Sequence, residues 1–483
     1  MNEHRLFIAG AWEEGSSWRD ILSPFSGKPV ARCAQASTEQ MDRALDAAAR
    51  AGREFRKISR FGRSRLLSLM ARGLEARRAE LVEAMVAEAG KPRTLADGEV
   101  GRAIVTFTFA AEEAKRLGGE VVAVDVDSAG RAYAPAVSTW SPRGPILAIA
   151  PFNFPLNLVA HKVAPALAVG ASVILKPAPQ APGASRLLAE IFAQAAAEAG
   201  DAREKIPAAV LQVLNGPNEV VAKAVGDPRI AILSFTGSDK VGWMLQAQAT
   251  RKKVILELGG NAAVIVAADA DLARAAARCA FGGFAYAGQV CISVQRVLVH
   301  KDAAMRFTEL LLAETAKVAC GDPSRPETLV GPLIDSAAAD RVMAWIEESR
   351  RDGASVLCGG SREANVIAPT VIAGVKPTAK LSCEEAFGPV VVLDEYGELD
   401  EAISAVNSSR FGLQAGLFTD SAAAIRRASE ELEVGGLMIN EVPTYRADNM
   451  PYGGLKDSGL GREGVRYTME EYCERRTVVA WRG

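Results

Sequence analysis

The sequence predicts an α/β protein built from two α/β units and a small β hairpin. Strand-like and helix-like segments alternate from Pro145 to about Asn440 in a chain of 483 residues. This alternation is typical of parallel sheets whose faces are covered by helices. The chain is also longer than the size at which one hydrophobic core keeps growing, so we expect two or three domains.

The opening segment is expected to be helical and to lead into a hairpin. Residues 37–118 show apolar positions at helical spacing with frequent Ala, Arg and Glu. Two extended runs follow, at residues 121–126 and 131–140, and they flank a turn at Ser128-Ala129-Gly130. Two strand-like runs around such a turn predict a β hairpin.

Alternating strands and helices then form the first α/β unit. Strands are expected at residues 146–150, 172–176, 210–214, 230–235 and 254–258, with helices at 156–170, 185–199, 218–225 and 241–248. A second set begins after Gly259, with strands at 262–266 and 294–300 around a helix at 272–281. The tail ends in a strand-like run at residues 477–481.

Composition excludes several functional classes. Lys and Arg number 56 against 58 Asp and Glu, a formal charge of -2, so we expect no nucleic acid partner and no anionic membrane partner. No apolar run is long enough to span a bilayer, and no signal peptide is evident. The three histidines are scattered, so no metal site is expected. Seven cysteines without a C-x-x-C pair indicate a reducing compartment, and we expect a cytoplasmic protein.

One cysteine has the surroundings of a nucleophile. Cys291 ends the run Gly288-Gln289-Val290-Cys291, in which Gly288 gives the backbone freedom for a close approach to a substrate. Glu257 lies upstream in Glu257-Leu258-Gly259-Gly260 and supplies a carboxylate that could act as a base. The remaining cysteines are expected to be small buried hydrophobic residues: Cys33, Cys279, Cys320, Cys358, Cys383 and Cys473.

Seven ordered motifs give the chain a family resemblance along nearly its whole length. Besides those around Cys291 and Glu257, they are Pro151-Phe152-Asn153-Phe154-Pro155, Lys176-Pro177, Phe235-Thr236-Gly237-Ser238, Glu385-Ala386-Phe387-Gly388-Pro389 and Pro451-Tyr452-Gly453-Gly454-Leu455-Lys456-Asp457-Ser458-Gly459. In this order and spacing they resemble the aldehyde dehydrogenase superfamily.

The resemblance implies a domain organisation and an assembly. It implies a Rossmann-like NAD(P)-binding domain at residues 1–120 and 144–256 and a catalytic domain at 257–445. Residues 121–143 and 462–483 would form a β segment that joins subunits into a homodimer or a homotetramer.

The resemblance also implies an NAD or NADP site, although the usual G-x-G-x-x-G fingerprint is absent. Lys176 would emerge at the carboxyl end of a strand and contact the adenosine ribose. The implied cofactor contacts are Lys176, Gly237, Ser238, Glu385, Phe387, Phe152 and Gly259. Many NAD-preferring members place a Glu three residues after this lysine, whereas this chain has Pro179, which makes NADP possible without demanding it.

The implied chemistry is the oxidation of an aldehyde to a carboxylic acid. Cys291 would attack the aldehyde carbon, and the Asn153 amide with the Cys291 backbone N–H would hold the oxyanion. Glu257 would then activate the water that hydrolyses the thioester on Cys291. Members that release the acyl group to coenzyme A generally lack this carboxylate, so its presence favours hydrolysis.

The substrate is the least determined part of the prediction. Arg102, His161 and Arg446 could lie near the aldehyde, and arginine suits phosphonate, phosphate or carboxylate groups. We therefore expect a small polar or anionic aldehyde, of the lactaldehyde, phosphonoacetaldehyde or glyceraldehyde-3-phosphate type, unless these residues form only structural ion pairs. The alternatives are a succinate-semialdehyde-like or broad-specificity aldehyde dehydrogenase, a catalytically silent protein on the same scaffold, and a cofactor-independent cysteine hydrolase.

Overall fold

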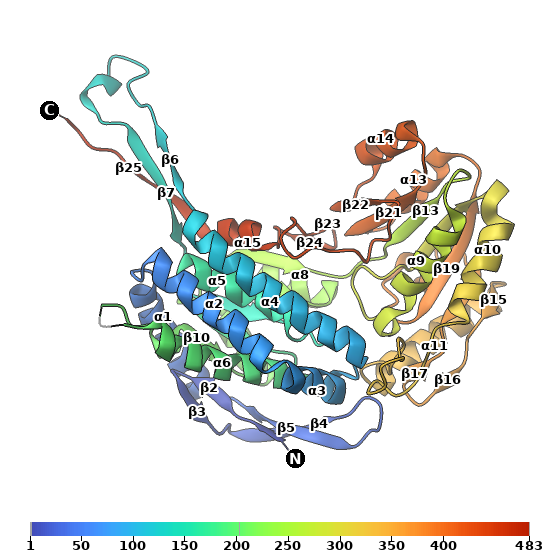
Figure 1. Cartoon of the computed structure of the whole chain (residues 1–483), viewed down its shortest axis with the longest axis horizontal. Coiled ribbons are helices and arrows are strands. Elements are labelled where there is room, and N and C mark those ends of the chain that lie inside the picture. The colour runs from blue at the N-terminus through green and yellow to red at the C-terminus, as the bar shows by residue number, and fades with distance from the viewer. Residues whose placement is uncertain (1, 202, 483) are drawn as a thin grey trace.

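A computed structural model of the chain describes residues 2–201 and 203–482. Two large sheets, each covered by helices, lie side by side, and a narrow three-stranded sheet projects from them as an arm (Figure 1). The helices are α1 (Thr38–Phe55), α2 (Arg60–Ala76), α3 (Arg78–Ala89), α4 (Arg93–Arg116), α5 (Asn157–Val169), α6 (Gly183–Ala199), α7 (Asn218–Gly226), α8 (Asp239–Ala249), α9 (Leu272–Phe284), α10 (Lys301–Thr315), α11 (Ser336–Arg351), α12 (Lys380–Cys383), α13 (Leu399–Asn407), α14 (Ala422–Glu431) and α15 (Val465–Glu471).

The first large sheet is parallel in its centre. Its strand order is β24 (Gly459–Leu460), β12 (Lys253–Glu257), β11 (Ile232–Thr236), β8 (Ile146–Ile149), β9 (Val173–Lys176), β10 (Leu211–Val213), β2 (Leu6–Ile8) and β3 (Ala11–Glu13). The strands from β12 to β10 run parallel, while β24 and β2 pair antiparallel at the two sides. Glu257 pairs with Gly459, so a segment close to the C-terminus completes this sheet.

The second large sheet is parallel except at one edge. Its strand order is β15 (Ser355–Cys358), β18 (Thr370–Ala373), β19 (Val390–Tyr396), β14 (Arg296–His300), β13 (Ala263–Val266), β21 (Gln414–Phe418) and β22 (Gly436–Ile439), with β15 antiparallel. These two helix-covered sheets confirm the predicted fold class of two α/β units.

Four smaller features complete the fold. The arm consists of β25 (Cys473–Val478), β7 (Ala136–Pro142) and β6 (Gly119–Val122), all antiparallel. An N-terminal sheet contains β1 (Asn2–His4), β5 (Pro29–Gln35) and β4 (Ser17–Leu22). Two short pairs are β16 (Arg362–Glu363) with β17 (Val366–Ile367), and β20 (Phe411–Gly412) with β23 (Leu455–Lys456).

Several predicted boundaries differ from the structure. The hairpin strands are shorter than residues 121–126 and 131–140, because residues 123–135 form a long connection with only a short 3-10 turn. The tail strand begins at Cys473 rather than at residue 477. The sequence prediction also missed the strands within residues 2–35, which are three to seven residues long and therefore give little periodic signal.

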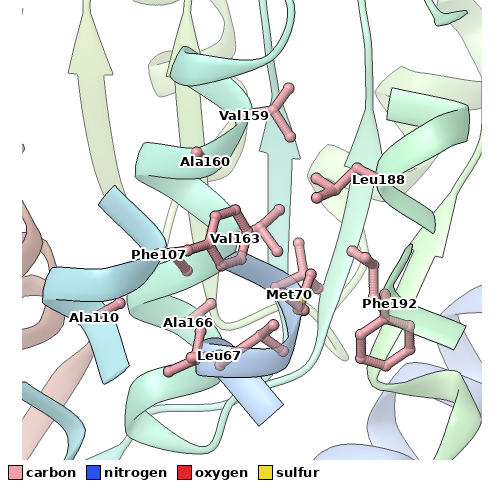
Figure 2. Close-up of a cluster of buried hydrophobic side chains, with 14 of the residues drawn as sticks. Leu67, Met70, Phe107, Ala110, Val159, Ala160, Val163, Ala166, Leu188 and Phe192 are labelled. Atoms are coloured by element: carbon pink, nitrogen blue, oxygen red, sulfur yellow. The ribbon is translucent and has the colours of Figure 1, made fainter. Parts of the chain in front are cut away.

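Apolar side chains fix how the helices cover the first sheet. Figure 2 shows α2, α4, α5 and α6 meeting over one face of it. The residues labelled there belong to one buried cluster: Leu67, Met70, Phe107, Ala110, Val159, Ala160, Val163, Ala166, Leu188 and Phe192. A second buried cluster, from α1, α7 and α8, covers the opposite face. Because both faces are covered, only the strand ends of this sheet are open to a ligand.

Candidate active site

All ten residues predicted for catalysis and cofactor binding line one pocket of about 760 Å³. They are Cys291, Glu257, Asn153, Lys176, Gly237, Ser238, Glu385, Phe387, Phe152 and Gly259. They come from both large sheets and from loops more than 200 residues apart in the sequence. Arg102, His161 and Arg446 do not line this pocket.

The pocket opens at the point where the first sheet reverses its strand order. From β8 the chain moves to β9 and β10 on one side, whereas β11 and β12 lie on the other side. Ile149 at the end of β8 and Thr236 at the end of β11 both line the pocket. In open α/β sheets this crevice at the carboxyl ends of the strands is the usual ligand site.

One end of the pocket fits the phosphates and ribose of a dinucleotide. Ser238 is the N-cap of α8, but its hydroxyl makes no capping bond, so the hydroxyl and the first N–H groups of the helix are available to an anion. Lys176 ends β9 and lines the pocket together with Pro179. Burial lowers the pKa of Lys176 to about 8.

The other end of the pocket holds a buried carboxyl group and two aromatic rings. Glu385 accepts a hydrogen bond of 3.1 Å from the Gly260 N–H, and burial raises its pKa to about 7. A side chain at Gly259 would approach the Glu385 carboxylate to 2.5 Å, so glycine leaves the room that this carboxylate needs. Phe387 packs edge-on against Phe152, with ring centroids 6.0 Å apart.

Cys291 follows a backbone of unusual conformation. Tyr286, Ala287 and Gly288 all have positive φ angles, of 53°, 53° and 67°. A side chain at Gly288 would collide with the carbonyl oxygen of Gly388, so only glycine fits this approach. Strain of this kind is found where the surrounding structure fixes a functional group. Burial raises the pKa of Cys291 to about 12, although a hydrogen bond with Tyr452 lowers it.

Two donors beside Cys291 suit an oxyanion. The Asn153 amide nitrogen donates one N–H to the carbonyl of Gln289 at 2.9 Å, which fixes the side chain and leaves its second N–H. Within the described residues, the backbone N–H of Cys291 has no protein acceptor. Asn153 is 3% exposed, so an interaction with its free N–H would not be weakened by bulk water.

Glu257 ends β12 as a buried carboxyl group. It is 3% exposed, and neither of its oxygens has a hydrogen-bond partner among the described residues. Burial, reinforced by the negative charge of Glu463, raises the pKa of Glu257 well above its usual value. Glu257 is therefore not held by an ion pair within the described residues.

The three predicted substrate residues all pair with carboxylates. Arg102 donates to Asp448 at 2.7 and 3.2 Å, and the ring of His161 meets the same carboxylate at 2.9 Å. Arg446 pairs with Glu463 at 3.1 Å. His161 is fully buried and Arg446 nearly so, whereas Arg102 is partly exposed. Two of their buried nitrogens have no partner in the described part of the chain, Nε of Arg446 and Nδ1 of His161.

Sequence reasoning missed two supports of the site. The Tyr452 hydroxyl lies 3.1 Å from the Cys291 sulfur. Its position in the glycine-rich motif that begins at Pro451 could have marked it as a residue of the site. Lys91 donates to Glu99 at 2.6 Å and to the Asn153 carbonyl at 2.8 Å. That buried pair gave no signal, because two charged residues on a helical segment predict a solvated face.

The other cysteines are not all buried as predicted. Cys33, Cys279 and Cys473 are buried, whereas Cys320 is exposed and Cys358 and Cys383 are partly exposed. Cys320 lies in the loop after α10, with its side chain at the surface. All seven cysteines are free thiols.

The pocket is large enough for a dinucleotide and lies at the switch point of an α/β sheet. A thiol, a carboxyl group and an amide also line it, and together these features indicate a protein of the class of nicotinamide-dependent oxidoreductases. The chain belongs to the aldehyde dehydrogenase family, whose sequence profile matches residues 12–478.

Individual relatives match nearly the whole chain. A 3-sulfolactaldehyde dehydrogenase from Priestia megaterium is 38% identical over 480 residues, covering 99% of this chain and 98% of the relative. Aldehyde dehydrogenase 21 from Physcomitrella patens, solved with the reaction product succinate, has a TM-score of 0.95 and 37% identity, covering 100% and 98% of the two chains. A glyceraldehyde-3-phosphate dehydrogenase from Methanocaldococcus jannaschii, solved with NADP, has a TM-score of 0.91 and 35% identity, covering 96% and 98%.

These matches confirm the predicted family, and the chain is an NAD(P)-dependent aldehyde dehydrogenase. The hypotheses of a silent scaffold and of a cofactor-independent hydrolase are not supported. Among residues 2–201 and 203–482, no helix combines the length and apolar character that crossing a bilayer requires.

Proposed function

We propose that this enzyme oxidises a short anionic aldehyde to the carboxylic acid. The observation behind this proposal is the unpartnered N–H of Arg446 Nε, which is buried beside the ring of Tyr452, the residue that contacts Cys291. A buried donor without an acceptor is costly, and an anionic substrate group would satisfy it. The sulfonated and phosphorylated aldehydes in the names of two relatives belong to the same chemical class.

We assign the chemistry to three residues. Cys291 attacks the aldehyde carbon: a sulfur–carbon bond forms, and the carbonyl π electrons move to the oxygen, which the Asn153 amide and the Cys291 N–H stabilise. NAD(P)⁺, when bound, accepts the hydride that leaves this carbon. The acyl group then remains on Cys291 as a thioester. Glu257 in its carboxylate form removes a proton from water, which attacks the thioester and releases the acid.

Changing Arg446 should weaken the oxidation of anionic substrates more than that of neutral ones. In Arg446→Met, the aliphatic stem is kept and Lys162 still neutralises Glu463 at 3.1 Å. Charged hydrogen bonds contribute about 1.5–3 kcal/mol. We therefore expect kcat/KM for 3-sulfolactaldehyde, glyceraldehyde 3-phosphate or succinic semialdehyde to fall roughly 10- to 150-fold relative to propanal.

The matched control is Arg278→Met, which removes an arginine paired with Glu441 outside the pocket and should leave all substrates unaffected. Equal losses on propanal and on the anionic aldehydes would contradict an anion site at Arg446. A panel in which the wild-type enzyme prefers long alkyl or aromatic aldehydes would contradict the proposed substrate class.

We assign the cofactor contacts to the two ends of the pocket described above, with Lys176 at the adenosine ribose. Because Pro179 supplies no carboxylate, nothing at this position repels the 2'-phosphate of NADP. The lowered pKa of Lys176, about 8, gives a testable consequence. Its ammonium form exists below that pH, so KM for NADP should rise as the pH increases through 8, and KM for NAD should change less.

The Lys176→Met variant should abolish that difference in pH dependence between NADP and NAD. Lys223→Met, which removes a lysine paired with Asp42 on the surface, is the control. Parallel pH dependence of the two KM values in the wild-type enzyme would argue against a lysine contact with the 2'-phosphate.

We also propose that the arm joins chains into a homodimer or a homotetramer and that the protein acts in the cytoplasm. The arm exposes large apolar side chains, which are costly in water and typical of a protein interface: Val121, Val122, Val137 and Val478. Sedimentation should therefore detect a particle of at least twice the 51.0 kDa chain mass, and Val121→Asp should shift it toward the monomer. A wild-type protein sedimenting as a monomer would refute this assembly.

A further inference from the structure

The sulfur of Cys291 makes one hydrogen bond within the described residues, and its partner is the Tyr452 hydroxyl at 3.1 Å. That hydroxyl has no other partner in the same part of the chain. Tyr452 is 3% exposed and packs with Ile292 and Leu413 beside Cys291. Its position is thus fixed by packing, and its single proton is directed to a single atom.

The surroundings of Cys291 otherwise disfavour ionisation. Burial is the largest cause of its high pKa, and the carboxyl groups of Glu385 and Glu257 raise it further. Two groups act in the opposite direction, the hydroxyl of Tyr452 and the positive charge of Arg446. Only Tyr452 among these groups contacts the sulfur directly.

The phenol of Tyr452 is placed to donate rather than to accept. Burial, with the nearby charges of Cys291 and Glu257, keeps its pKa well above the usual value despite the opposing charge of Arg446. The hydroxyl therefore retains its proton at neutral pH and cannot serve as a base for the thiol. Once Cys291 is a thiolate, the hydrogen bond has only one possible direction, from oxygen to sulfur.

A buried cation strengthens this donor. The guanidinium carbon of Arg446 lies 3.7 Å from the centroid of the Tyr452 ring, within the range of a cation–π contact. Glu463 holds Arg446 in place at 3.1 Å and is itself held by Lys162. Positive charge over the ring withdraws electron density from the phenol, which makes its O–H a better hydrogen-bond donor.

We propose that Tyr452 is a further catalytic residue, whose hydroxyl donates a hydrogen bond to the Cys291 sulfur and stabilises the thiolate before it attacks the aldehyde. This inference rests on the proposed role of Cys291 as the nucleophile. The thiol proton leaves to water in the pocket, and the phenol keeps its own proton throughout. As the sulfur–carbon bond forms, negative charge moves from sulfur to the substrate oxygen, and the Tyr452 bond weakens while the Asn153 bond strengthens.

The test measures the thiolate itself, without any aldehyde. The ultraviolet absorbance of the thiolate is followed against pH in Tyr452→Phe and in the wild-type enzyme, each corrected with the matching Cys291→Ala background. Alkylation of Cys291 by iodoacetamide, located by peptide mass spectrometry, is measured in parallel. We expect about tenfold less thiolate at a given pH in Tyr452→Phe, a rise of about one unit in the midpoint.

A matched control removes a buried hydroxyl elsewhere. Tyr472 is fully buried and lies outside the pocket, so Tyr472→Phe should leave the Cys291 thiolate unchanged. A second variant tests the opposite direction. Incorporating 3-fluorotyrosine at position 452 keeps the shape of the side chain and makes the phenol a stronger donor, so the thiolate fraction should increase.

Thiolate and alkylation curves that are the same in Tyr452→Phe as in the wild-type enzyme would overturn the inference, even if aldehyde turnover fell. If Tyr452→Phe did not fold, an unchanged thiolate fraction with 3-fluorotyrosine would overturn it instead. The proposed function fails by a different result, namely full aldehyde turnover by Cys291→Ala, which leaves the thiolate measurement on Tyr452 unaffected.

Discussion

Cys291→Ala is expected to abolish aldehyde oxidation while leaving the fold and cofactor binding intact. Without the sulfur no thioester forms, and loss of a catalytic nucleophile commonly lowers kcat by about 10⁴- to 10⁶-fold. The cavity left by one sulfur atom is small and lies at a pocket surface, so the heat-unfolding midpoint should change little. The measurements are the initial rate of NAD(P)H formation and cofactor binding by calorimetry.

Cys320→Ala is the matched control, because it removes an exposed thiol outside the pocket. It should oxidise aldehydes at the wild-type rate. Turnover by Cys291→Ala at more than about one per cent of the wild-type rate would show that another group is the nucleophile, since a true knockout lies well below that level.

Glu257→Gln is expected to separate the two halves of the reaction. Cys291 and Asn153 are unchanged, so one equivalent of NAD(P)H should form rapidly, whereas steady-state turnover should fall roughly 10²- to 10⁴-fold because no base activates the water. Stopped-flow absorbance of NAD(P)H resolves the burst from the steady state. A fall of the burst and the steady state by the same factor would place Glu257 in the hydride-transfer half instead.

The pH dependence of the wild-type enzyme follows from the same residue. A base works only when ionised, and burial holds the pKa of Glu257 well above its ordinary value. Steady-state turnover should therefore increase as the pH rises through this elevated pKa and be lost below it. In Glu471→Gln, which removes a carboxylate paired with Lys253 outside the pocket, this profile should be unaltered.

The parts that sequence predicted well are those with a local signal. Strands and helices from β8 to β14 follow clear apolar periodicity, and the loop glycine at position 288 marks a backbone that admits no side chain. The ten pocket residues belong to the motifs whose order indicated the family. Members of that family share a fold, so the family resemblance also predicted that these residues line one pocket.

The parts that sequence did not predict depend on contacts between distant segments. Nothing near Arg446 in the sequence shows that its guanidinium pairs with Glu463 and covers the ring of Tyr452. Similarly, the pairing of Lys91 with Glu99 and with the backbone of Asn153 arises only when α4 packs beside α5. Such partners are fixed by tertiary packing, which a single sequence does not display.

The pairing of β24 with β12 places a late segment of the chain beside the proposed catalytic residues. Gly459 lies next to Glu257, and Tyr452, Arg446 and Glu463 come from the same late segment. During synthesis, this site can therefore form only after residues 446–463 have left the ribosome, because domains fold in order from the N-terminus. A nascent chain that ends shortly after Cys291 lacks Tyr452 and Arg446, which surround that thiol in the folded enzyme. Removing residues 446–463 would therefore disrupt the site although Cys291 itself is retained.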